Sequence, residues 1–225
     1  MLKRLDINGN PFLGVLCSAS DHLAIASSEM NDAECAEISE CLGVPVARAT
    51  IGGSRVVGSL CALNSQGVLV SDLASKQELD ALRKAVPGTS LLKLAGKLNA
   101  IGNNILVNDR AALIHPDMSN AVARRIADFL GVEVLRGTVA GIKTVGSAAA
   151  VNSRGLLCHP RATAAERKAL SDLFGVPVTP GTANYGSPMI GACMVANSRG
   201  AAAGAPSTGI EMGRIEEGLG LIQDP

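Results

Sequence analysis

Aromatic residues are nearly absent from this chain of 225 residues, which has three Phe, one Tyr and no Trp. Proteins that bind single-stranded nucleic acids stack bases on aromatic side chains, and this chain lacks that platform. Its 20 Lys and Arg residues are balanced by 20 Asp and Glu residues, so it also lacks the broad positive field that attracts nucleic-acid backbones. We therefore expect no free nucleic acid as a ligand, and a core built from Val, Leu, Ile and Ala.

Long apolar runs are also missing from the sequence. No stretch approaches the roughly 20 apolar residues of a membrane span. Asp6, Asn8, Asn10 and Pro11 interrupt the N-terminal region where the apolar core of a signal peptide would lie. The six cysteines show neither the paired short spacing of a zinc site nor a secretory context. These absences predict a cytoplasmic protein with reduced thiols, no membrane contact, and no metal or cofactor.

Three series of residues recur along the chain at one spacing. The first is an asparagine, or a serine in one copy, at Ser20, Asn64, Asn108, Asn152 and Asn197. Six residues earlier lies a glycine, at Gly14, Gly58, Gly102, Gly146 and Gly191. The third series can cap helix N-termini, at Asn31, Ser75, Ser119, Thr163 and Thr208. Each series steps by 44, 44, 44 and 45 residues, so five copies of one unit fill the chain.

The repeats predict one domain over residues 1–225, because five units near 44 residues leave no room for a second body. We place the copies at about 12–55, 56–99, 100–143, 144–188 and 189–222. A strand at residues 2–8 precedes the first copy, at the offset where the other copies place their third strand. This segment would supply the strand that copy five lacks and close the copies into a ring without exposed edges.

The fourth copy shows the order of elements within a unit. Residues 145–151 form an apolar run that predicts a strand, and residues 156–159 predict the returning strand. Between them, residues 152–155 (NSRG) predict a hairpin turn in which Asn and Gly take left-handed backbone conformations. A third strand begins at residues 176–178. Each unit is therefore expected to be strand, turn, strand, helix, strand, and the fold class is α/β.

The helix of each unit has its own signals. In the fourth copy Thr163 would cap it, with Glu166 completing a reciprocal capping box, and Gly175 would end it. Leu170, Leu173 and Phe174 fall on one apolar face at the spacing of a helix. Four of the five capping residues have a glutamate three positions later, at Glu34, Glu78, Glu166 and Glu211. These helices are expected to pack between layers of the ring.

Ring closure brings the five hairpin turns to one face. Their third positions are His22, Gln66, Arg110, Arg154 and Arg199, which would form a locally positive rim on a molecule of zero net charge. Such residues are usually solvated turn tips, and a set of five on one face is also a candidate binding surface. We expect the turns to be exposed, so that Asn108→Ser or charge reversal at Arg110 would weaken partner binding with little loss of stability.

The sequence resembles the translation initiation factor 6 family, in its archaeal form, nearly from end to end. The matching segments are 51–59 (IGGSRVVGS), 102–103 (GN), 108–109 (ND), 113–116 (LIHP), 144–147 (TVGS), 180–184 (PGTAN), 191–193 (GAC), 196–200 (ANSRG), 208–209 (TG) and 217–222 (EGLGLI). Eukaryotic members carry a long tail after this point, and its absence after Ile222 favours an archaeal-type factor.

The resemblance implies a five-bladed α/β propeller, the pentein fold, and a monomer that is not an enzyme. It also implies binding to the large (50S) ribosomal subunit, mainly to its proteins at the intersubunit face. That binding would keep the small (30S) subunit from docking, and a part in large-subunit maturation is also expected. Carried over to matching positions, the expected partner-binding residues are Ser59, Asn64, Asn108, Asp109 and Arg110.

An enzyme is the main alternative, because related five-fold propellers include amidine hydrolases and amidinotransferases with a channel cysteine, a histidine and carboxylates. The residues available for this chemistry are Cys193 or Cys158, His115 or His159, and Asp109 or Asp172. His115-Pro116 and His159-Pro160 lie 44 residues apart, so repeat position explains both histidines without catalysis. A general scaffold that binds another protein through the same rim is a third possibility.

Overall fold

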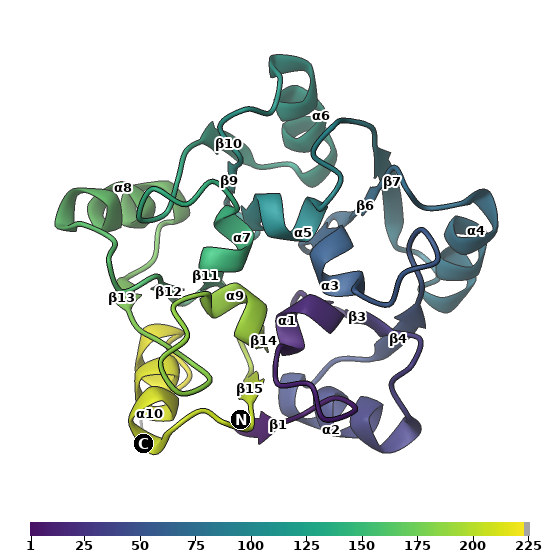
Figure 1. Cartoon of the computed structure of the whole chain (residues 1–225). Coiled ribbons are helices and arrows are strands. Elements are labelled where there is room, and N and C mark those ends of the chain that lie inside the picture. The colour runs from purple at the N-terminus through teal and green to yellow at the C-terminus, as the bar shows by residue number, and fades with distance from the viewer. Residues whose placement is uncertain (223–225) are drawn as a thin grey trace.

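The computed structural model describes residues 1–222 and shows five blades arranged as a ring (Figure 1). Each blade has a short helix near the centre, a three-stranded sheet and a long helix outside. Blade 1 contains α1 (Leu13–Leu16), β2 (Cys17–Ala19), β3 (Ala24–Ser27), α2 (Asp32–Leu42) and β4 (Val46–Ala49). Blade 2 contains α3 (Val57–Leu60), β5 (Cys61–Leu63), β6 (Gly67–Ser71), α4 (Lys76–Ala85) and β7 (Ser90–Leu94).

The remaining blades repeat this order. Blade 3 contains α5 (Ile101–Asn104), β8 (Ile105–Val107), β9 (Ala111–Ile114), α6 (Asn120–Leu130) and β10 (Glu133–Arg136). Blade 4 contains α7 (Val145–Ala148), β11 (Ala149–Val151), β12 (Leu156–Cys158), α8 (Ala164–Phe174) and β13 (Val178–Pro180). Blade 5 contains α9 (Ile190–Cys193), β14 (Met194–Ala196), β15 (Ala201–Gly204), α10 (Gly209–Gly218) and, from the other end of the chain, β1 (Leu2–Leu5).

The N-terminal strand closes the ring, as the repeat offset predicts. In every sheet the first two strands of the blade are antiparallel and the third is parallel to the second. In blade 5 the parallel partner of β15 is β1, with Leu2 opposite Ala201 and Leu5 opposite Gly204. The N-terminal amine also donates a hydrogen bond of 2.7 Å to the Arg199 carbonyl oxygen. The prediction of a closed five-fold α/β propeller is confirmed.

The first strand predicted for each blade is wrong over its first half, because that half is a short helix. In blade 4 the apolar run begins with helix α7 and becomes strand β11 only at Ala149. Equivalent short helices occur in the other four blades and surround the ring axis (Figure 1). A short apolar run does not distinguish a buried strand from a buried helical turn, because both remove the whole run from water.

The repeating glycine explains why a helical turn fits near the axis. A Cβ atom placed on Gly146 would lie 2.0 Å from the carbonyl oxygen of Gly102, which is far too close. The same clash would occur around the whole ring, for Gly14 on Gly191, Gly58 on Gly14, Gly102 on Gly58 and Gly191 on Gly146. Each short helix therefore packs its glycine directly on the backbone of the neighbouring short helix, which no larger residue permits.

The long helices begin where the capping series predicts. Each cap side chain accepts a hydrogen bond from the backbone N–H three residues later, at Asn31, Ser75, Ser119, Thr163 and Thr208. Four of these helices have the full reciprocal box with glutamate. The fifth long helix, α6, lacks this box because Val122 occupies the glutamate position. Helix α8 ends at Gly175 with left-handed backbone (φ 69°), as predicted.

Five apolar clusters hold the ring together, and each lies between successive blades. In one of them Ile25 of blade 1 packs with Val57 and Val70 of blade 2. In the next, Leu69 of blade 2 packs with Ile126 of blade 3. Blades 3 and 4, 4 and 5, and 5 and 1 share clusters in the same way. Because each blade shares its core with its neighbours, stability depends on every junction around the ring.

Candidate partner-binding site

The five hairpin turns lie at one end of the ring, which we call the turn end. It comprises residues 20–23, 64–67, 108–111, 152–155 and 197–200. The short helices lie at the other ends of the same inner strands, and we call that side the helix end. The third turn residues are exposed in all five blades, at His22, Gln66, Arg110, Arg154 and Arg199. Asp109 is exposed beside Arg110.

Asn64 and Asn108 are not exposed turn tips, contrary to the sequence expectation. The side chain of Asn108 is buried and links two blades. Its Oδ1 accepts hydrogen bonds from the N–H groups of Arg110 (2.9 Å) and Ala111 (3.0 Å). Its Nδ2 donates across the junction to the carbonyl oxygens of Asn152 (3.1 Å) and Phe174 (3.5 Å). Asn108 is therefore a clasp between blades 3 and 4.

The same clasp recurs at three further junctions. Asn64 donates to the carbonyl oxygens of Asn108 and Leu130. Asn152 donates to those of Asn197 and Leu219, and Asn197 to those of Ser20 and Leu42. At the junction of blades 1 and 2 the shorter Ser20 accepts the N–H of His22 within its own turn. The recurring asparagine thus connects each turn to the C-terminal end of the next long helix.

The turns do not use the left-handed backbone predicted for them. In the described chain the residues with positive φ lie in other loops and at helix ends, and they do not include Asn152 or Gly155. Glycine is required at position 155 for a different reason. A Cβ atom there would lie 2.2 Å from the carbonyl oxygen of Gly218, so the turn packs directly on the end of helix α10.

Two arginines of the rim lie against helix C-termini. Arg199 Nη1 donates to the carbonyl oxygen of Gly43 at 2.5 Å, and Nη2 donates to that of Asp21. A Cβ atom on Gly175 would lie 2.8 Å from Arg110 Nη1, so that side chain lies over the end of helix α8. A cation in this position interacts favourably with the negative end of the helix dipole. Both side chains are nevertheless exposed and available to a partner.

The second turn residues are all acids or hydroxyls, at Asp21, Ser65, Asp109, Ser153 and Ser198, and within residues 1–222 they link the turns at three junctions. Asp109 Oδ1 accepts the Ser65 N–H at 2.7 Å, and Asp21 Oδ1 accepts the Ser198 N–H at 2.7 Å. The sequence reasoning missed this series apart from Asp109. Its signal was the position directly after each recurring Asn or Ser, which holds only Asp or Ser.

The structure separates Ser59 from the other candidate residues. Ser59 lies in helix α3 and is buried, with 7% of its surface exposed. Strand β5 runs from this helix to the turn that contains Asn64. Ser59 is therefore at the helix end, whereas Asn64, Asn108, Asp109 and Arg110 share the turn end. Of the five candidates, Asp109 and Arg110 alone are exposed.

A sequence profile of the eIF-6 family matches residues 2–218. The chain belongs to the eIF-6 family. It is 45% identical over 219 residues to a translation initiation factor 6 of Archaeoglobus fulgidus, covering 96% of this chain and 99% of that protein. It is 44% identical over 225 residues to that of Pyrococcus furiosus (98% and 99% covered) and 39% over 223 residues to that of Methanosphaerula palustris (99% and 100% covered). The resemblance found in the sequence is confirmed.

These eIF-6 relatives are named as initiation factors and not as enzymes. In this family member the histidines occupy a structural turn position. Nδ1 of His115 accepts the N–H of Asp117, and Nδ1 of His159 accepts that of Arg161, both at 3.1 Å. In blade 2 the hydroxyl of Ser71 takes the same role. Repeat position therefore accounts for both imidazoles, as the 44-residue spacing indicates.

The candidate thiols have the opposite properties from activated nucleophiles. Burial raises the pKa of the Cys158 thiol to about 11, and burial also raises the pKa of Cys193. Cys193 Sγ lies 3.3 Å from the hydroxyl of Ser187, and Asp172 pairs with Lys168.

No group of three or more His, Cys, Asp and Glu within residues 1–222 is arranged to hold a metal ion. No helix of the described chain is long and apolar enough to cross a bilayer.

Proposed function

We propose that this protein binds the large (50S) ribosomal subunit through its turn end and sterically prevents joining of the small (30S) subunit. Membership of the eIF-6 family is the observation that carries this proposal. The protein would act in the cytoplasm as a monomer, and it would also take part in maturation of the large subunit. Its partners on the subunit would be mainly ribosomal proteins at the intersubunit face.

The turn end supports this assignment by its chemistry. Asp109 and Arg110 are exposed side by side, so the surface presents both signs of charge instead of a uniformly basic face. A mixed polar surface suits a protein partner, because charges of both signs can be matched and fix the docking orientation. In the proposed site Asp109 and Arg110 contact the subunit, while the clasps of Asn64 and Asn108 hold the turns in place. Ser59 lies at the opposite end and is left out of this contact surface.

An amidine-processing enzyme is the competing function, and the chemistry of the candidate thiols argues against it. A cysteine nucleophile reacts as the thiolate, which a positive neighbour or helix N-terminus normally stabilises. Burial raises the pKa values of Cys158 and Cys193, and it outweighs the opposing effects of Arg167 on Cys158 and of the Ser187 hydroxyl on Cys193. An assay for hydrolysis of arginine and methylated arginine tests this alternative. Turnover that disappears in Cys193→Ala would overturn the proposal of a non-enzymatic factor.

Sedimentation with separated ribosomal subunits tests the proposed function directly. The protein should co-migrate with the large subunit, and subsequent addition of the small subunit should give no joined particle. Arg110→Glu should weaken binding by about tenfold or more, because it reverses a central charge of the contact surface. Arg124→Glu is the matched control, since Arg124 is an exposed arginine on helix α6 and away from the turns. Failure of the folded wild-type protein to bind either subunit would refute the proposal and favour a scaffold for another partner.

A further inference from the structure

At the helix end, four loops between a third strand and the next short helix fill the same space in their blades. Each begins with an apolar residue that is at most 1% exposed, at Ile7, Ile51, Val139 and Ala183. Each loop is closed by an isolated antiparallel bridge, which pairs Ile51 with Ser54 in blade 2. We call the buried residue the plug. Ile51 belongs to the same apolar cluster as Val57 and Ala74.

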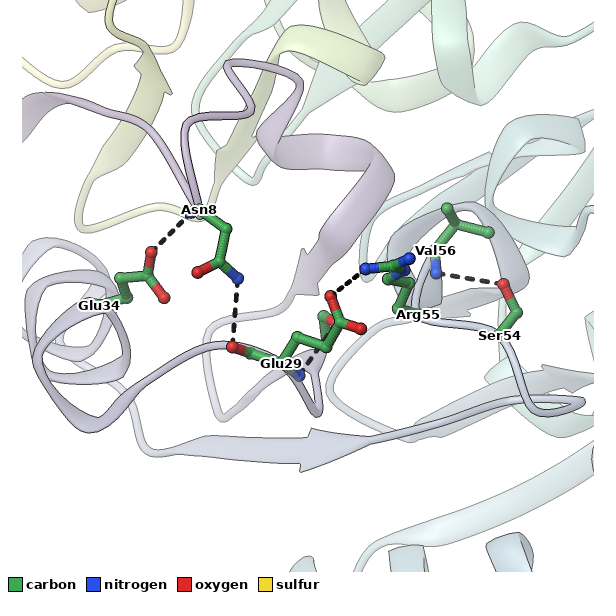
Figure 2. A network of polar contacts seen from close by, with 7 residues as sticks. Asn8, Glu29, Glu34, Ser54, Arg55 and Val56 are labelled. Carbon is green, nitrogen blue, oxygen red and sulfur yellow. Dashed lines mark hydrogen bonds and ion pairs between the residues drawn. The ribbon is translucent and has the colours of Figure 1, made fainter.

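A carboxylate seals each of these four loops. In blade 2, Glu78 accepts hydrogen bonds from the N–H groups of Gly52 (3.0 Å), Gly53 (2.9 Å) and Ser75 (2.8 Å). Figure 2 shows the blade 1 version, in which Glu34 accepts the N–H of Asn8. Glu166 and Glu211 bond to the corresponding loops of blades 4 and 5. The capping glutamate thus serves both the helix N-terminus and the loop over the plug.

Blade 3 lacks both parts of this arrangement. Ala95 occupies the plug position and is exposed, and Val122 replaces the sealing glutamate. Residues 95–98 form none of the isolated bridges seen in the other four loops. The N–H of Ser119, which would bond to the missing carboxylate, has no acceptor among residues 1–222. Asp72 accepts the N–H of Gly96 at 3.4 Å, but no carboxylate among the described residues bonds both this loop and the Ser119 N–H. Two independent sequence changes therefore leave blade 3 without an aliphatic plug and without the sealing glutamate.

A cavity of about 290 Å³ lies at this place in blade 3. Its apolar walls are Leu94, Leu98, Ile101, Met118 and Val122. Ile101 and Met118 correspond in the repeat to Val57 and Ala74, which share the cluster of the plug in blade 2. The cavity therefore includes the space in which the other blades hold their own aliphatic plug. Its volume is just below the range of small-molecule pockets, about 300 to 1,000 Å³, and leaves room for one inserted side chain.

The rim of the cavity carries a lysine that no acid among the described residues neutralises. Lys97 lines the opening and forms no ion pair within residues 1–222. Asp117, the acid at the rim, is already paired with Lys143 at 2.8 Å. The Ser119 N–H, which has no acceptor in the described part of the chain, adds a donor at the start of helix α6. Charge complementarity therefore favours an acidic group beside the apolar one.

We propose that the blade 3 cavity is a docking site for a protein partner, which inserts one aliphatic side chain and places an adjacent acidic residue at the rim. The partner would supply in trans the two groups that the other blades supply from their own chain. The cavity is at the helix end, so it stays accessible when the turn end is covered. The inference does not depend on ribosome binding, because both tests below use the purified protein alone.

Methyl NMR with 4-methylpentanoate as the probe tests the site, because this small molecule joins a branched aliphatic group to a carboxylate. It should shift the methyl signals of Leu98, Ile101 and Met118 with a roughly millimolar Kd. Acetate and isobutanol, which each carry half of the probe, should bind at least about tenfold more weakly. Val122→Glu restores the sealing carboxylate and should abolish the shifts. Equal shifts in wild type and Val122→Glu, or none in wild type, would overturn the proposal.

Glu78→Val is the matched control, because it removes a sealing carboxylate from blade 2 and leaves the plug Ile51 in place. This variant should not gain a probe site in blade 2, and circular dichroism would establish that it is folded. Selection from a displayed random-peptide library tests the class of partner. Enrichment of aliphatic residues next to Asp or Glu, competed by 4-methylpentanoate and lost in Val122→Glu, supports a protein partner. Probe binding without such enrichment would limit the cavity to small carboxylates and refute the docking proposal.

Discussion

Replacing Asn108 by serine should destabilise the protein, because the asparagine clasps two blades and is not a free turn tip. Serine can accept one N–H within its own turn, as Ser20 does in blade 1 at 3.3 Å. It is too short to donate to the carbonyl oxygens of Asn152 and Phe174 across the junction. It also loses the second bond inside the turn, from the Ala111 N–H at 3.0 Å.

The magnitude follows from these lost bonds. A buried hydrogen bond contributes about 1 kcal/mol net, so two to three lost bonds should lower the free energy of unfolding by about 2 to 3 kcal/mol. In a chain of this length each 1 kcal/mol shifts Tm by roughly 2 to 4 °C. The expected fall in Tm is therefore roughly 4 to 12 °C. The fold itself should survive, because the junction between blades 1 and 2 already has serine at this position.

Thermal unfolding followed by circular dichroism gives the comparison, with Arg110→Gln as the control. Glutamine occupies the equivalent position in blade 2, so this control changes an exposed turn residue and spares the clasp. It removes a cation from the end of helix α8 and should cost at most about 1 kcal/mol. If Asn108→Ser has the same Tm as the wild-type protein, the buried hydrogen bonds contribute nothing to stability and Asn108 does not clasp the two blades.

Three further changes test other parts of the structure. Burial raises the pKa of Glu78, but hydrogen bonds from the Gly53 and Ser75 N–H groups outweigh it and bring the pKa to about 2. The contribution of Glu78 to stability is therefore complete above about pH 4.5 and is lost as pH falls toward 2. Urea unfolding of Glu78→Gln should show a shallower acid dependence than that of the wild-type protein. Leu170→Ala removes a buried contact and should lower the free energy of unfolding by roughly 2 to 5 kcal/mol. An unchanged urea midpoint would mean that this face of helix α8 does not pack in the core. Gly146→Ala forces a clash at the axis and should cost roughly 1 to 3 kcal/mol or more, whereas Gly213→Ala, with open space in helix α10, should stabilise by about 0.4 to 1 kcal/mol in the same measurement.

The sequence was sufficient for those features whose interaction partner is local or is given by the repeat. Thr163 and Glu166 form the predicted reciprocal box because their partners lie within one turn of the same helix. Gly175 ends helix α8 because the left-handed conformation is a local requirement. Closure by residues 2–5 was also predictable, since the repeat offset shows which strand copy five lacks. In each case the interaction partner can be located from the periodicity alone.

The features that escaped prediction depend on contacts between blades. Gly146 is a glycine because of a carbonyl oxygen 44 residues earlier, and nothing in its own segment reveals the helical turn it occupies. Asn108 is buried because its side chain reaches the end of helix α8, although its turn reads as a polar hairpin tip. Periodicity identified both positions as important. It did not give the reason, because the distance between copies in space is absent from a single sequence.

A residue that recurs in every copy is therefore stronger evidence for structure than for binding. Repetition satisfies contacts that are themselves repeated around the ring, such as the axial glycines of all five blades and the asparagine clasps of four junctions. A macromolecular partner without five-fold symmetry must instead distinguish one blade from the next. It can do so only where the copies differ, as Asp109 and Arg110 differ from Ser65 and Gln66 at the turn end, or as Val122 differs from the four sealing glutamates at the helix end. The asymmetric positions, and not the repeating ones, are where substitutions should separate binding from folding.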